Sequence, residues 1–188
     1  MNVDWLKKYY LDNRIPLSKF NVIGIRDETD MSKDVINDRL GFFTDTELFL
    51  CPGTTDPSVY WTKNPERNKL GTFHLMEGFH EKVWAFGIHK GYEALVNDWK
   101  KCKPTKGWRD SNYNFTRDAK DIVVCDYFGV NFHRMDKISI VKSIGKYSAG
   151  CQVVQNPKDF AYILQKAKES GQQTFSYMLF KNTEVCDG

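Results

Sequence analysis

Apolar residues recur at strand-like spacing along most of the chain and at helical spacing in two stretches. Residues 2–12 predict an amphipathic helix, and residues 156–172 predict a longer one that ends at Gly171. Apolar and aromatic runs bounded by glycine, proline or polar turn residues predict strands elsewhere. These expected strands are residues 20–28, 46–55, 71–78, 81–91, 106–114, 121–135 and 174–180.

The pattern is less regular at three places. Residues 32–43 predict one or two helical turns stopped by a glycine, and the proline-containing stretch 55–71 predicts a loop. Gly129 breaks the run 121–135, which therefore predicts a strand pair or a bulged strand. Together these elements predict a mixed α/β fold dominated by strands.

The composition is that of a folded domain. The 188 residues are 41% hydrophobic and 27% charged, so the chain is long enough for a full core and unlike a disordered segment. Basic residues exceed acidic residues by only 27 to 24, without a basic block, so charge does not indicate nucleic acid. We expect a single domain over residues 1–188 that acts as a monomer.

Export signals and paired cysteines are not apparent. The first residues carry scattered charges and no apolar stretch of signal-peptide length, and no later stretch is long enough to cross a bilayer. We therefore expect a chain made in the cytoplasm, without a membrane anchor. The cysteines are odd in number and lack C-x-x-C spacing, so we expect no disulfide framework, no metal and no cofactor. They are Cys51, Cys102, Cys125, Cys151 and Cys186.

One cysteine stands in a turn of small residues. Cys151 lies in the stretch Y-S-A-G-C-Q-V-V-Q, between Gly150 and Gln152 and just before the predicted helix. A cysteine nucleophile needs a group that lowers the pKa of its thiol or accepts its proton, most often a histidine. The stretch therefore raises the question of which histidine could serve Cys151.

The four histidines differ in their surroundings. His133 ends an apolar run that turns charged immediately afterwards, which places it where a buried strand emerges. His74 and His89 lie in strand-like runs and are by default structural, and His80 lies in a turn and is expected to be solvent-exposed. His133 is therefore the candidate base for Cys151.

Two segments resemble the catalytic core of the L,D-transpeptidase family of peptidoglycan enzymes. G-V-N-F-H-R-M ends a strand at His133. Fourteen residues separate His133 from Ser148, which opens a turn similar to the family's Ser/Thr-x-Gly-Cys turn, with Cys151 at its end. Upstream, K-L-G-T-F is similar to the family's P-x-G-x-[FY] strand, without the proline. The resemblance covers residues 69–155 as a catalytic core and leaves residues 1–60 unassigned within the same domain.

The resemblance implies a fold and a chemistry. The fold is a β-sandwich with a helix packed after the nucleophile turn, and the chemistry is covalent acyl transfer on peptidoglycan stem peptides. Cys151 would attack an amide carbonyl and form a thioester, while His133 takes the thiol proton and returns it to the leaving amine. Backbone N–H groups at Gly150 and Cys151 would hold the oxyanion, and Ser148 would help to fix the turn.

The chain departs from the family at Ala149, where a histidine is common. His89 is then either a substitute for that histidine or a structural residue. Arg134 either binds a stem-peptide carboxylate or is a solvated strand end, and Gln152 is a further candidate for substrate contact.

The fate of the thioester leaves several functions open. Because no leader or wall-binding module is apparent, we expect a hydrolase that acts on the cell wall after release or delivery, such as a phage- or prophage-borne L,D-carboxypeptidase or endopeptidase. The alternatives are a cross-linking L,D-transpeptidase and a non-catalytic wall-binding or virion structural protein. A papain-type protease is disfavoured because its histidine follows its cysteine. The stretch K-G-W-R-D-S-N-Y-N-F-T-R-D fits an exposed strand and turn better than a nucleic-acid-binding segment.

Overall fold

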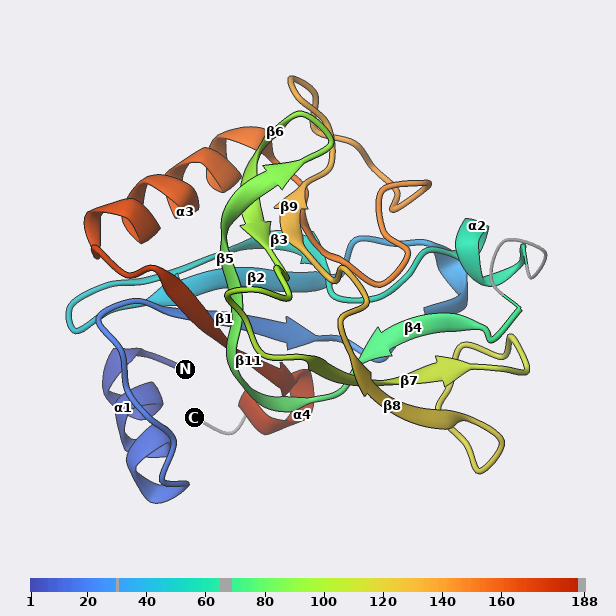
Figure 1. Ribbon diagram of the computed structural model, residues 1–188, viewed down its shortest axis with the longest axis horizontal. Helices are drawn as coiled ribbons and strands as arrows, with labels where there is room; N and C mark the ends of the chain where they lie inside the picture. Colours follow the sequence, from blue (N-terminus) through green and yellow to red (C-terminus); the bar gives the residue numbers. More distant parts are fainter. Residues whose placement is uncertain (30, 65–68, 186–188) are drawn as a thin grey trace.

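Strands dominate the architecture of the protein. Its structure is a computed structural model that describes residues 1–29, 31–64 and 69–185. One group of strands is β1 (Asn21–Arg26), β2 (Asp38–Phe43), β3 (Leu48–Thr54), β5 (Gly78–His89), β6 (Tyr92–Val96), β9 (Phe132–Arg134), β10 (Gln152–Val154) and β11 (Thr174–Lys181). They close into a barrel in the order β1-β11-β5-β6-β9-β10-β3-β2 (Figure 1). A separate three-stranded sheet has the order β4-β7-β8, with β4 (Thr72–Leu75), β7 (Thr105–Asp110) and β8 (Ile122–Asp126). The mixed, strand-dominated class is confirmed, with a closed barrel where the resemblance implied a sandwich.

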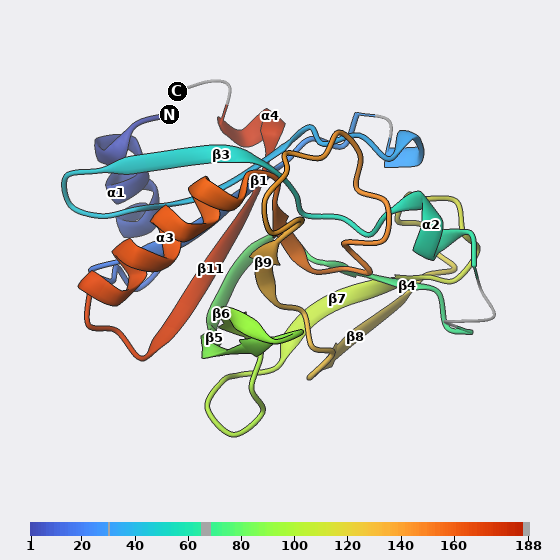
Figure 2. The same cartoon turned by 90° about the horizontal axis from the view of Figure 1, so that it is seen from above.

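Four α-helices and one 3₁₀ turn occur in the described ranges: α1 (Val3–Asp12), α2 (Val59–Thr62), α3 (Pro157–Glu169), α4 (Asn182–Val185) and η1 (Met31–Lys33). The side chain of Asn156 caps α3 by accepting a hydrogen bond from the Lys158 N–H. Figure 2 shows α3 beside the barrel strands, where the Tyr162 ring packs 5.0 Å from that of Phe49 on β3. No helix in these ranges is long and apolar enough to cross a membrane.

The two expected helices are confirmed, but residues 32–43 are helical only at their start, and they end in a strand. They contain η1 and then β2, whose Gly41 lies opposite Leu50 of β3. A Cβ on Gly41 would lie 1.8 Å from the carbonyl oxygen of Phe49. Gly41 is therefore a strand glycine that permits close approach of β3, and it does not stop a helix.

The expected loop 55–71 contains the one-turn helix α2, for which Ser58 is the N-cap. Residues 65–68 of that stretch lie outside the described residues, as does Cys186. Strand β6 was not predicted, although it pairs with β5 in a hairpin. The cysteines that the structure describes, Cys51, Cys102, Cys125 and Cys151, are free.

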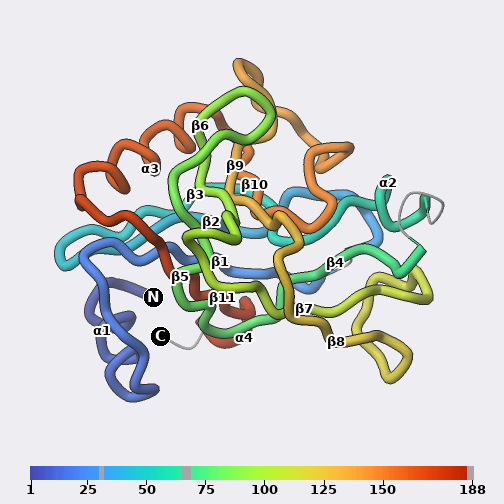
Figure 3. The backbone as a smooth tube through the Cα atoms, viewed as in Figure 1, coloured from blue at the N-terminus to red at the C-terminus, as the bar shows by residue number. Residues whose placement is uncertain are grey.

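The run 121–135 divides into two strands that belong to different sheets. β8 ends the small sheet, and β9 enters the barrel after Gly129, which has a φ of +67°. β9 pairs in parallel with β10, which follows the cysteine turn. Figure 3 shows the two strands next to each other, with the loop 135–151 that joins them reaching above and to the right. The fold thus brings the His133 strand and the Cys151 turn side by side.

Candidate active site

Cys151 directly precedes β10, the strand that pairs with the His133 strand β9. The register places Gln152 opposite Phe132 and Val153 opposite His133, so Cys151 lies next to Asn131. Asn131 comes just before β9, and Cys151 just before β10. Cys151 therefore lies on the neighbouring segment, two residues before the position opposite His133.

Cys151 is half-buried as a residue, and backbone groups hold its thiol. The Asn131 N–H donates to Sγ at 3.5 Å, and Sγ lies 3.6 Å from the Gly129 carbonyl oxygen, which accepts the thiol hydrogen. Burial raises the pKa of the thiol, and neither the Asn131 N–H nor the positive charge of Lys90 offsets this effect. The resting group is therefore a neutral thiol that needs a base to take its proton.

His133 has the properties of that base. The side chain is 2% exposed, and its Nδ1 lies 2.8 Å from the backbone carbonyl oxygen of Arg134. A carbonyl only accepts, so we assign the ring proton to Nδ1 and a lone pair to Nε2. Nε2 is buried and has no partner among the described residues. Burial, the largest cause, and charge repulsion from neighbouring His89, the second, lower the pKa of His133 to about 3. The ring is therefore neutral at physiological pH.

Tyr92 supports His133 and was missed by the sequence analysis. Its hydroxyl donates to the Arg134 carbonyl oxygen at 3.2 Å and lies 3.2 Å from His133 Nδ1. Burial raises the pKa of Tyr92, so its hydroxyl stays protonated. Tyr92 begins the unpredicted strand β6, so the sequence pattern did not relate it to the site.

His89 lies against His133, 44 positions away in the chain. The two rings stack with centroids 4.1 Å apart and planes 18° from parallel. Asn131 holds His89, because its Nδ2 donates to His89 Nδ1 at 3.0 Å. Burial and the positive charge of Lys90 lower the pKa of His89, so this ring is also neutral. The β5–β6 hairpin thus contributes a second imidazole to the site.

Ser148 organises the cysteine turn. It is fully buried, its Oγ donates to the Cys151 carbonyl oxygen at 2.8 Å, and the same Oγ accepts from the Gly150 N–H at 3.2 Å. The expectation that both the Gly150 and Cys151 N–H groups hold an oxyanion is therefore not met, because the Gly150 N–H is already bonded. The Cys151 N–H has no acceptor among the residues that the structure describes.

Gly150 is required by a close backbone approach. It has a φ of +122°, and a Cβ there would lie 2.4 Å from the carbonyl oxygen of Phe73. Phe73 belongs to β4, the strand that contains part of the K-L-G-T-F segment. The missing side chain thus makes room for β4, whereas the sequence analysis had related the glycine to the substrate.

The remaining candidates divide between the interior and the surface. Gln152 is fully buried: its Nε2 donates to the Thr55 carbonyl oxygen at 3.1 Å, and its Oε1 accepts from the Tyr177 hydroxyl at 2.8 Å. Gln152 therefore has no group left for a substrate, which corrects that expectation. The Arg134 guanidinium is partly exposed and stacks 4.1 Å over the Tyr92 ring, and Ala149 is exposed.

The other two histidines belong to the interior. His80 is 7% exposed and lies 2.7 Å from the Met76 carbonyl oxygen, so the expectation of a solvated His80 is wrong. His74 is fully buried, and its Nδ1 lies 3.1 Å from Asp56 Oδ1. Both contacts support a structural role.

Asp56 belongs to a buried charge network that the sequence analysis did not identify. Arg26 on β1 pairs with Asp56 at 3.1 Å and donates to the Leu75 carbonyl oxygen of β4 at 2.9 Å, linking the barrel to the small sheet. Burial would raise the pKa of Asp56, but the Arg26 charge and the His74 hydrogen bond outweigh it and lower that pKa. Burial and the Asp56 charge raise the pKa of Asp38 to about 7.

The stretch considered for nucleic acid does not present a stacking surface. Two of its three aromatic residues, Trp108 and Phe115, are only 4% and 7% exposed, and Tyr113 is half-buried. The side chains of Asn112 and Asn114 both donate to Asp118 Oδ2, at 2.7 and 2.9 Å. These contacts favour a loop stabilised from within over a nucleic-acid-binding segment.

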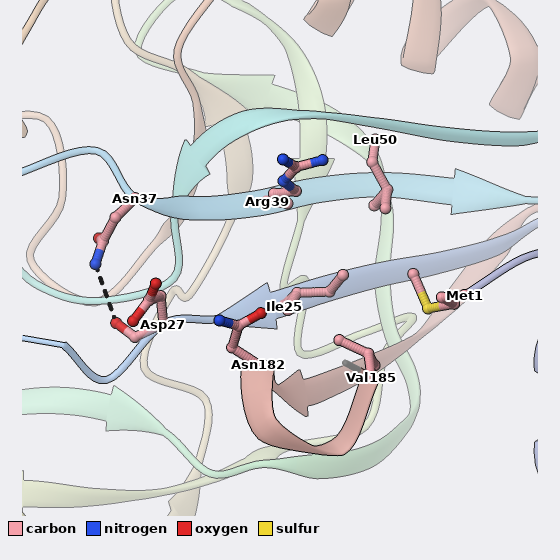
Figure 4. A pocket seen from close by; sticks show the side chains of 8 residues that line it. All are labelled: Met1, Ile25, Asp27, Asn37, Arg39, Leu50, Asn182 and Val185. Atoms are coloured by element: carbon pink, nitrogen blue, oxygen red, sulfur yellow. Dashed lines mark hydrogen bonds between the residues drawn. The ribbon is translucent and has the colours of Figure 1, made fainter. Parts of the chain in front are cut away.

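A cavity of about 380 Å³ lies away from the cysteine turn (Figure 4). It is lined by Met1, Ile25, Asp27, Asn37, Arg39, Leu50, Asn182 and Val185. None of these residues belongs to the group around Cys151. Figure 4 shows Asn37 bonded to the backbone of Asp27, at 3.2 Å, within this lining.

Comparisons with protein-family models, with curated proteins and with solved structures found no match for this chain.

Proposed function

We propose that this protein is a cysteine-dependent acyl-transfer enzyme that hydrolyses peptidoglycan stem peptides through a thioester. The observation that carries the proposal is the buried Nε2 of His133, partnerless among the described residues, on β9, the strand that pairs with β10 directly after Cys151. A neutral thiol and a neutral imidazole can act as nucleophile and base by proton transfer during attack.

The proposed reaction begins when His133 Nε2 takes the proton of Cys151. The sulfur bonds to the carbonyl carbon of a diamino acid in the stem peptide, and the carbonyl π electrons move to oxygen. Collapse of this intermediate breaks the C–N bond, and the leaving D-amino acid takes the proton from His133. Water then attacks the thioester, His133 again serves as base, and the thiol of Cys151 is restored.

The charges near the thiol support a substrate with a free carboxylate. The positive charge of Lys90 is close enough to lower the pKa values of His133 and Cys151, and Arg134 follows His133 directly. Neither cation has a carboxylate within ion-pair distance among the described residues. Two unpaired cations favour a carboxylate-bearing peptide, which supports a carboxypeptidase that removes a terminal D-amino acid.

Mass spectrometry of muropeptides incubated with the purified protein tests this function. Loss of the terminal D-alanine from a tetrapeptide supports a carboxypeptidase, cleavage of a cross-linked dimer supports an endopeptidase, and a new cross-link supports a transpeptidase. Cys151→Ala and His133→Asn should both abolish turnover, since asparagine keeps the bond to the Arg134 carbonyl but has no Nε2 base. An unmodified muropeptide mixture with the wild-type protein would refute catalysis and favour a non-catalytic wall-binding or virion structural protein.

A further inference from the structure

The site as described provides one backbone donor for a developing oxyanion. The Cys151 N–H has no acceptor in the described part of the chain, whereas the Gly150 N–H is bonded to Ser148. Acyl-transfer sites place preorganised donors, from backbone or side chains, where negative charge develops on the carbonyl oxygen. A second donor must come from a side chain if this turn keeps its structure during the reaction.

The hydrogen bonds of Asn131 determine which nitrogen of His89 carries the proton. Asn131 Oδ1 accepts from the backbone N–H of Asn97 at 2.9 Å, and a backbone N–H only donates. The amide orientation is therefore fixed, and Asn131 Nδ2 must be the donor to His89 Nδ1 at 3.0 Å. With Nδ1 as the acceptor, the neutral His89 ring carries its hydrogen on Nε2.

The Nε2 atoms of His89 and His133 therefore have opposite hydrogen-bonding roles. His89 Nε2 is a hydrogen-bond donor and His133 Nε2 is an acceptor, and both are buried without a partner among the described residues. The rings stack nearly parallel, so neither Nε2 can lie in the plane of the other ring to bond with it. Buried polar atoms without partners are rare in native proteins, and a catalytic role is one of the explanations for them.

We propose that His89 is a catalytic residue that donates a hydrogen bond from Nε2 to the oxyanion, together with the Cys151 N–H. This inference rests on the proposed acyl transfer. When the thiol proton passes to His133 and sulfur bonds to the carbonyl carbon, the displaced π electrons form an oxyanion that these two donors stabilise. Collapse returns the electrons to the carbonyl, and the donors keep their protons throughout.

The test compares His89→Phe with His89→Gln in the release of D-alanine from a peptidoglycan tetrapeptide. Phenylalanine keeps an aromatic ring against His133 but has no donor, whereas the Nε2 of glutamine supplies an N–H group near the position of the histidine Nε2. We expect His89→Phe to lower kcat by roughly 10²–10³-fold with little change in KM, and His89→Gln to retain most of kcat. Alkylation of Cys151 by iodoacetamide forms no oxyanion and should keep the wild-type pH profile in both variants.

Several results would overturn the role of His89 while leaving acyl transfer intact. One is a wild-type kcat in His89→Phe, and another is an equal loss in both variants. A changed alkylation profile in His89→Phe would show that His89 acts only through His133. If the wild-type protein forms no thioester and releases no D-alanine, the proposed function fails, and the inference about His89 fails with it.

Discussion

Replacement of Gly150 by alanine tests the packing that holds the nucleophile turn. The new Cβ would lie 2.4 Å from the Phe73 carbonyl oxygen, 1.0 Å inside the 3.4 Å at which ordinary contact begins. A side chain at a φ of +122° costs about 1–3 kcal/mol of backbone strain, and overpacking costs about 1–3 kcal/mol more. We therefore expect Gly150→Ala to lose about 2–6 kcal/mol of stability, or at least ~4 °C in Tm for a domain of this size.

Gly145→Ala is the matched control. Gly145 lies in the same loop and has a φ of +54°, but a Cβ there would meet nothing within 4 Å. We expect this variant to lose only about 1–2 kcal/mol and to keep its activity. Gly150→Ala should also lose most of its turnover, because the backbone next to Cys151 must move away from β4. Thermal denaturation with a muropeptide assay measures both effects, and equal stability and activity in the two variants would refute the packing argument.

Three further predictions concern the base, its support and the buried charges. Because the pKa of His133 is about 3, kcat/KM should stay level from about pH 5 to 8 and fall only as His133 becomes protonated at lower pH. A fall in kcat/KM around pH 6.5, the ordinary pKa of histidine, would contradict the low pKa of His133. Tyr92→Phe removes the hydroxyl beside His133 Nδ1 and should lower kcat up to roughly tenfold, since one neutral hydrogen bond contributes about 0.5–1.5 kcal/mol. Alkylation of Cys151 should not change, and a wild-type kcat would exclude a supporting role for Tyr92. Asp56→Asn removes the more buried of the two carboxylates paired with Arg26, the other being Glu77, and should cost about 3–5 kcal/mol in urea denaturation, so an unchanged midpoint would contradict the network.

The sequence predicted the elements whose signals are local. The helix α3 has a capping asparagine and an apolar face with helical spacing, and the glycine break in the run 121–135 marks the end of one strand and the start of another. Residues 38–43 form β2, although their pattern predicts helical turns that end at a glycine. The actual reason for this glycine, the approach of the Phe49 carbonyl, depends on a partner strand.

In the candidate site too, residues with a local sequence signal could be predicted, and residues whose role depends on a distant partner could not. Cys151 and His133 could be proposed from the sequence because each stands in a recognisable local pattern; His133 lies on β9, and Cys151 directly precedes the paired strand β10. The roles of Tyr92 and Asn131 could not be predicted, since their contacts depend on the β5–β6 hairpin lying against β9. The buried Gln152 was misjudged because its position after Cys151 suggested a substrate contact, whereas strand alternation turns its side chain into the interior.

Trapping the covalent intermediate tests the central claim most directly. The wild-type protein is mixed with a peptidoglycan tetrapeptide, quenched in acid within the first turnover, and analysed by intact and peptide mass spectrometry. The proposed function predicts a tripeptide acyl group on Cys151, release of one D-alanine, and neither product in Cys151→Ala. Release of D-alanine by Cys151→Ala, or an acyl group on another residue, would contradict it.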